Sequence, residues 1–209
     1  MITMRKKREW YENATYHIMG RGVHRCTIFY DEGDYENFMY ILQQIKKKYP
    51  FDLHAFCLMT NHFHLQISTR LDPIWNIMKS LMRNYAMTFN QKHDFRGHLF
   101  EARYNSCIIK RDDYFLEVSR YIHLNPVKAC IVKNPLDYPY SSYGKYITDL
   151  GDYPSRRYSY LADTTRVFTC FGSDARNEYK NFVEGTDPHT DTETMIQNDI
   201  GEDEMWLPR

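Results

Sequence analysis

Two spacings of apolar residues alternate between residues 14 and 126, and their order restricts the fold more than any other feature of the chain. Apolar segments typical of β-strands cover Ala14–Met19, Leu53–Met59 and His62–Ser68, and another strand is expected within 98–109. Helical spacing covers Asp34–Tyr49, a segment that starts at Asp72-Pro73, and one that runs from Asp112 towards Asn125-Pro126. The first six elements follow the split β-α-β order. We therefore expect an α+β, ferredoxin-like (RRM-like) antiparallel sheet with helices packed on one face, plus a C-terminal extension.

Changes in composition predict where the domains end. Residues 1–147 contain the strand and helix patterns and form the expected main domain. Residues 148–183 are rich in Tyr and Ser with weaker periodicity, so we expect a partly helical extension. Residues 184–209 are acidic and poor in apolar side chains, which predicts a flexible tail.

The formal charge of zero is the sum of two unlike parts. The tail from Glu184 to Arg209 has eight acidic residues and one basic residue, so residues 1–183 have 26 basic and 19 acidic residues, a net charge of +7. A basic body is compatible with a nucleic-acid partner. The tail is either a passive solubilising extension or a mimic of nucleic-acid charge that competes for a basic groove.

Composition narrows the class of protein further. The chain is 43% hydrophobic and 26% charged, as globular proteins are, and it has no apolar run of the ~18 residues that a membrane span needs. No hydrophobic segment follows the basic start, so we expect no signal peptide. Five scattered cysteines argue against a disulfide framework and a CxxC zinc site, and they favour a cytoplasmic protein with reduced thiols.

Two histidines, His62 and His64, form the first candidate site. On a strand their side chains leave the same face, while Phe63 points into the core. Two adjacent imidazoles can bind one divalent metal if a third ligand comes from elsewhere. They can also be ordinary histidines on a polar face.

A tyrosine and an asparagine form the second candidate site. Tyr121 and Asn125 are four residues apart, so on a helix they share a face. A phenol is a possible nucleophile on phosphorus, and an asparagine on the same face is a possible metal ligand. Pro126 disfavours helical geometry at Asn125, which predicts that the helix ends there. Tyr121 is also one of 18 tyrosines, most of which serve packing.

Together these segments resemble the single-tyrosine HUH (His-hydrophobic-His) transposases, and in particular the REP-associated tyrosine transposases. The resemblance extends over about residues 14–145 and departs from the family at Cys130, where relatives usually have glycine, a change that we expect to affect a helix end rather than the chemistry. The matching motifs are Y-H-I-M-G-R-G-V-H-R, I-F-Y-D, L-M-T-N-H-F-H-L, R-Y-I-H-L-N-P-V-K-A-C-I-V and P-L-D-Y-P-Y-S-S-Y.

The resemblance implies a function and assigns roles to single residues. Residues 1–147 become a catalytic domain that cleaves and joins single-stranded DNA at hairpins. Tyr121 becomes the nucleophile of a 5′-phosphotyrosine intermediate, and His62, His64 and Asn125 become ligands of Mg²⁺ or Mn²⁺. Related enzymes include dimers, so a monomer and a homodimer both stay open.

The basic residues that contact DNA are predicted less directly. Arg21 and Arg25 follow the first strand, where a turn can present them to phosphates or base edges, although both can be plain surface arginines. The run Arg5, Lys6, Lys7 and Arg8 is expected to be a nonspecific phosphate-contacting arm. Two other functions remain: a noncatalytic module that binds DNA or RNA hairpins, and a metal-dependent hydrolase of small phosphoesters.

Overall fold

The computed structural model describes residues 10–148 and 159–185, and its centre is a four-stranded sheet. The strands are β1 (Thr15–Arg21), β2 (Phe51–Leu58), β3 (His62–Thr69) and β4 (Asn105–Ile109). Their order is β2-β3-β1-β4, and every neighbouring pair is antiparallel. The predicted α+β, ferredoxin-like fold is confirmed.

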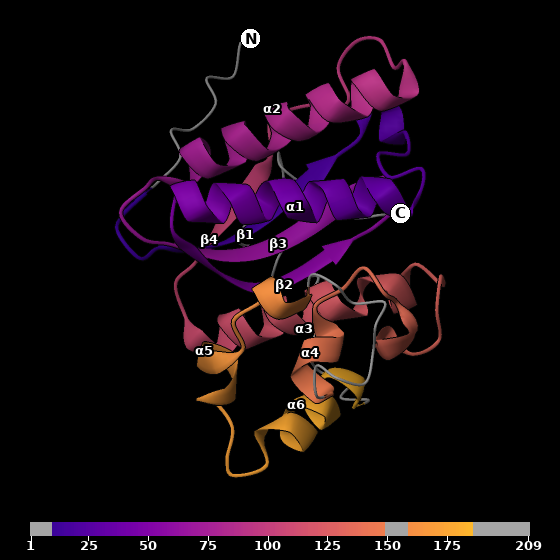
Figure 1. Cartoon of the computed structure of the whole chain (residues 1–209). Helices are drawn as coiled ribbons and strands as arrows, with labels where there is room; N and C mark the ends of the chain where they lie inside the picture. Colours follow the sequence, from indigo (N-terminus) through magenta and orange to yellow (C-terminus); the bar gives the residue numbers. More distant parts are fainter. Residues whose placement is uncertain (1–9, 149–158, 186–209) are drawn as a thin grey trace, which may run out of the picture.

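Helices α1 (Glu32–Lys48) and α2 (Ile74–His93) cover one face of the sheet (Figure 1). Their apolar stripes pack with Ile18, Phe63 and Leu65 in one buried core. This layer of two helices is the one that the split β-α-β order predicts. Within the described residues, no helix is both long enough and apolar enough to span a membrane.

Helix α3 (Asp112–Lys128) lies across the other face (Figure 1). A second buried core joins Ala55, Cys57 and Cys107 of the sheet to α3, α4 (Tyr143–Ile147), α5 (Thr165–Phe168) and α6 (Ala175–Glu184). The expectation that the helices pack on one face is met by α1 and α2 but is wrong for α3, because helical spacing does not specify which face of the sheet a helix covers. The sheet is therefore covered on both faces, and the described part of the C-terminal extension packs against α3.

Two predicted boundaries are wrong by a few residues. Strand β1 continues through Gly20 to Arg21, because Gly20 pairs with Phe63 and its missing side chain leaves room for that ring. Helix α3 passes through Pro126 and ends at Lys128, because the Ala129 amide still bonds to the Asn125 carbonyl at 2.9 Å. Asn125 therefore lies inside the helix rather than at its end.

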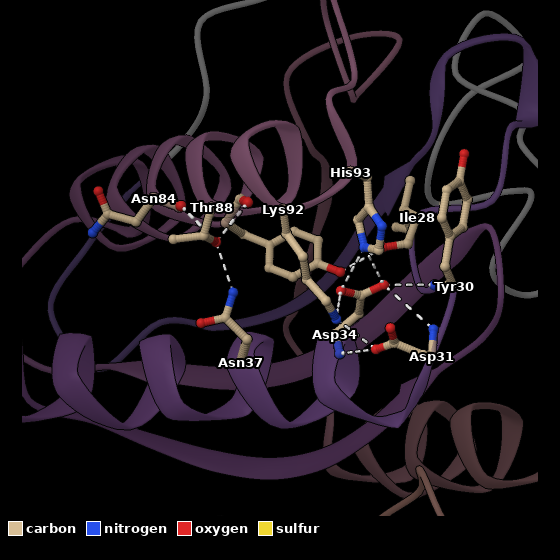
Figure 2. A network of polar contacts seen from close by, with 10 residues as sticks. Ile28, Tyr30, Asp31, Asp34, Asn37, Asn84, Thr88, Lys92 and His93 are labelled. Carbon is tan, nitrogen blue, oxygen red and sulfur yellow. Dashed lines mark hydrogen bonds and ion pairs between the residues drawn. The ribbon is translucent and has the colours of Figure 1, made fainter.

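A polar network joins the start of α1 to the end of α2 (Figure 2). Asp31 caps α1, and Asp34 accepts a hydrogen bond from the Tyr30 amide at 2.7 Å. Lys92 contacts Asp31 at 2.6 Å and Asp34 at 2.8 Å, and the His93 Nε2 lies 2.9 Å from Asp34. Asp31, Asp34 and His93 are close enough to share a cation, but the Lys92 ammonium already contacts both carboxylates. The network therefore acts as a structural brace between the two helices.

Candidate active site

A pocket of about 580 Å³ opens where the end of β1, the start of β3, residues 101–105 and the second half of α3 meet. It brings together six residues that the sequence singled out from separate segments: Arg21, Arg25, His62, His64, Tyr121 and Asn125. The other four, Arg5, Lys6, Lys7 and Arg8, lie outside the described residues.

The two histidines enter the pocket because strand β3 alternates its side chains. His62 pairs with Arg21 and His64 pairs with Met19 across β1, on the face that α3 covers. The ring centroids of the two histidines are 5.1 Å apart. Phe63, between them, points to the opposite face and joins the core under α1 and α2, as predicted.

Hydrogen bonds to neighbouring side chains orient both imidazoles. The Nδ1 of His62 lies 2.6 Å from the Asn61 side-chain oxygen, which can only accept, so Nδ1 carries the proton and Nε2 keeps its lone pair. The Nδ1 of His64 lies 3.1 Å from the Nε2 of His17. When His64 donates in that bond, its own Nε2 also keeps a lone pair. Partners of this kind are typical of metal-binding histidines.

The environment of the pocket keeps the imidazoles neutral. Burial, assisted by the Arg21 charge, lowers the pKa of His62 to about 4. Burial lowers the pKa of His17 to about 4 as well. The pKa of His64 falls well below its ordinary value, first through burial and then through His62 and His17. Neutral imidazoles at physiological pH are ready to bind a metal without first losing a proton.

Helix α3 supplies the opposite wall of the pocket. The Gln66 side chain of β3 anchors the helix through a 2.8 Å hydrogen bond to the Phe115 carbonyl. Further along, the Tyr121 ring meets the His64 ring edge-to-face with centroids 5.5 Å apart. The Tyr121 side chain therefore packs against His64 and lines the pocket at the same time.

Asn125 is held by its own helix. Its amide nitrogen donates to the Tyr121 carbonyl at 2.8 Å, which leaves the side-chain oxygen as its acceptor atom. With the histidines this gives two imidazole nitrogens and one amide oxygen in the same pocket. Mg²⁺ and Mn²⁺ accept oxygen ligands, and imidazole suits transition metals, so the donor set fits the divalent metal that the resemblance implies.

The two arginines take different positions at the mouth of the pocket. Arg21 forms a two-pronged ion pair with Glu101, at 3.1 and 3.3 Å. Arg25 is exposed and follows His24 in the left-handed region, with φ of 59° and 50°. Such backbone strain is often found at functional sites.

Sequence reasoning did not assign a role in the pocket to Asn61, Glu101 or Lys128. Asn61 orients His62, and its position next to that histidine is a weak signal. Lys128 follows Tyr121 by seven residues, a helical repeat that the sequence does contain. No local sequence pattern indicates that Glu101 belongs to the pocket, because its partner Arg21 lies 80 residues away.

The sheet order and the pocket define a ferredoxin-like α+β protein in which two histidines, a tyrosine and an asparagine meet. The sequence profile described as "Transposase IS200 like" matches residues 10–125, more than half of the chain. The chain belongs to this family of IS200-like transposases. No match is found among curated proteins.

Solved structures resemble this chain at low sequence identity. A REP-associated tyrosine transposase bound to a REP hairpin superimposes with a TM-score of 0.59 at 19% identity, over 74% of this chain and 90% of that chain. A structure assigned as a transposase from Deinococcus radiodurans R1 gives a TM-score of 0.41 at 21% identity, over 57% and 95%. A bacterial tRNA(His) guanylyltransferase-like protein in complex with ATP gives 0.38 at 11% identity, over 71% and 74%.

Proposed function

We propose that this transposase cleaves and rejoins single-stranded DNA beside hairpins, through a covalent link to Tyr121. The observation that carries the proposal is that His62, His64, Tyr121 and Asn125 line one pocket. The structural relative bound to a REP hairpin supports the choice of a hairpin substrate. The five free cysteines fit a cytoplasmic protein.

Tyr121 is the nucleophile in this proposal. Its phenol oxygen attacks the phosphorus, the P–O3′ bond breaks, and the 3′ oxygen leaves as a hydroxyl after taking up a proton. The phenol proton passes to solvent, and the 5′ phosphate stays on Tyr121. Joining is the reverse exchange, in which a 3′-hydroxyl attacks the phosphotyrosine. One ester replaces another, so the reaction needs no ATP.

His62, His64 and Asn125 would hold Mg²⁺ or Mn²⁺ beside the nucleophile. When bound, such a metal acts as a Lewis acid on a phosphoryl oxygen and orients the phosphate. The neutral imidazoles keep their lone pairs for it, and the bonds from Asn61 and His17 fix the ring orientation.

Basic residues around the pocket would bind the DNA backbone. Arg25 and Arg103 line the pocket and are exposed, so phosphates can reach them. Arg21 would present its guanidinium from the ion pair with Glu101. The run from Arg5 to Arg8 remains a proposed nonspecific arm, and whether the enzyme works as a monomer or a homodimer stays open.

A covalent-adduct assay tests the proposal. A 5′-unlabelled, 3′-labelled hairpin strand incubated with Mn²⁺ should leave a label on the protein that survives denaturation, and a chelator should prevent it. Tyr121→Phe should lose the adduct completely, because it lacks the attacking oxygen. Tyr40→Phe, on the exposed side of α1, is the matched control and should keep full activity.

The same assay separates the alternatives. A noncatalytic hairpin-binding module would bind the hairpin, with or without chelator, and would form no adduct. A phosphoester hydrolase would cleave without labelling the protein. An adduct that persists in Tyr121→Phe would mean that Tyr121 is not the nucleophile.

A further inference from the structure

Lys128 is a cation on the same helix face as the proposed nucleophile. It follows Tyr121 by seven residues and Asn125 by three, so all three side chains share one face of α3. Its ammonium nitrogen lies 5.0 Å from the centroid of the Tyr121 ring. All three residues line the pocket.

Lys128 also has an ordinary structural explanation. It is the basic residue in the last turn of α3, where a cation interacts favourably with the helix dipole. That role is met by a lysine pointing in any outward direction. It does not require the ammonium to lie over the Tyr121 ring inside the pocket, so the observed position indicates a second role.

The other charged residues of the pocket are less well placed than Lys128 to act beside the Tyr121 ring. On the opposite wall, the Arg21 guanidinium faces the Glu101 carboxylate, so the charge of that pair is largely cancelled. Arg25, on the loop after β1, and Arg103, shortly before β4, also line the pocket, but both are exposed, and neither is on the helix that carries Tyr121. The α3 wall carries both Tyr121 and Lys128, and no acidic residue is among the lining residues of that wall.

We propose that Lys128 is a catalytic residue whose ammonium contacts the scissile phosphate and the Tyr121 phenol oxygen during the exchange. This inference rests on the proposed function. As the phenol oxygen bonds to phosphorus and the P–O3′ bond breaks, negative charge builds up on the non-bridging oxygens. A fixed cation beside them stabilises that transition state more than the ground state. In the joining direction the same ammonium stabilises the departing phenolate.

The test compares binding with chemistry in three variants. Lys128→Met should form adduct about 10- to 100-fold more slowly at saturating hairpin, which is less than the ~10²–10³-fold cost of losing a buried oxyanion-hole donor because Lys128 is exposed. Its hairpin affinity should change by less than about 3-fold, since one phosphate contact among several is lost. Lys128→Arg keeps the charge and should recover most of the rate. Lys133→Met makes the same charge change at an exposed position outside the pocket and should react as the wild type does.

The reverse reaction adds a readout that a structural role does not move. Preformed adduct mixed with a strand ending in a 3′-hydroxyl should resolve more slowly in Lys128→Met by the same factor as adduct formation, because both directions share one transition state. Equal rates for wild type and Lys128→Met would overturn the role of Lys128. So would a Lys128→Arg variant that melts at the wild-type temperature but reacts as slowly as Lys128→Met. If the wild type itself forms no adduct, the proposed function fails first, so the two failures are distinguishable.

Discussion

At the scale of single residues, the position of the two histidines depends on a contact on the opposite face of the sheet. Gly20 pairs with Phe63, and a Cβ at position 20 would lie 2.4 Å from the Phe63 ring. The alternation of His62, Phe63 and His64 is readable from the sequence. The role of Gly20 is not, because its partner lies 43 residues away and only the strand register brings the two together.

The contact between Gly20 and Phe63 can be tested by adding a methyl group at position 20. Gly20→Ala should lower the free energy of unfolding by about 1–3 kcal/mol, because the added methyl group overpacks the core against the Phe63 ring. It should also slow adduct formation, since Phe63 carries His62 and His64 on either side. Denaturant titration measures the first effect. Adding Phe63→Leu should restore part of the stability, and an additive double variant would argue against the contact.

Cys130 is a residue at which sequence reasoning anticipated the structure. The family usually has glycine there, which suggested an effect on a helix end. In the structure Cys130 follows the last turn of α3 with a φ of 55°, in the left-handed region that favours glycine. The departure from the family therefore affects the backbone at the end of the helix that carries Tyr121.

At the scale of elements, the order of strands and helices was predictable because period-two and helical patterns are local. The face that α3 covers was not, because it depends on contacts such as Gln66 with the Phe115 carbonyl, 49 residues apart. The brace between α1 and α2 was not predictable either, because its contacts also join residues far apart in the sequence. It joins Asp31 and Asp34 to Lys92 and His93, about 60 residues further on.

The brace predicts a pH dependence of stability. Burial alone raises the pKa of Asp34, but hydrogen bonds from Lys92, His93 and the Tyr30 amide outweigh burial and hold the pKa below its ordinary value. A lowered folded-state pKa gives stability that is complete above the unfolded value and is lost as the pH falls through the folded value. Asp34→Asn should therefore cost about 2–4 kcal/mol at pH 7 and clearly less at pH 3.

Denaturant titrations of wild type and Asp34→Asn at pH 7, 5 and 3 measure this difference. Asp34 is ionised at both pH 7 and pH 5, so the decrease in cost should fall below pH 5. An equal cost at pH 3 would show that the carboxylate charge does not stabilise the brace. Asp94→Asn, an exposed carboxylate just after α2, is the matched control.

At the scale of the whole molecule, α6 ties the C-terminal extension to the helix that carries Tyr121. His123 of α3 is fully buried and bonds to the Tyr179 hydroxyl and the Ser142 hydroxyl, each at 2.7 Å. Tyr143 donates to Glu184 at 2.8 Å, and Arg120 donates to the Gly185 carbonyl at 3.0 Å. The predicted acidic tail therefore begins with two residues that contact the body. Its flexibility stays a prediction, since residues 186–209 lie outside the described part of the chain.

These contacts define where the tail should be removed. Truncation after Gly185 keeps both contacts and removes seven acidic residues and one basic residue. If the tail competes with DNA for the basic body, hairpin affinity should rise about 3- to 10-fold at 50 mM salt and less at 200 mM, because salt screens the competition. Fluorescence anisotropy measures it. Affinity that is unchanged at low salt would leave the tail a passive extension.

The proposed function requires that the phenol oxygen of Tyr121 becomes bonded to DNA. The most direct measurement is mass spectrometry of the wild-type adduct after nuclease and protease digestion, which locates the residue that carries the nucleotide. We expect a 5′-phosphonucleotide on the peptide that contains Tyr121, and no modified peptide in Tyr121→Phe. A nucleotide on another residue, or a cleaved hairpin with no modified peptide, would contradict it.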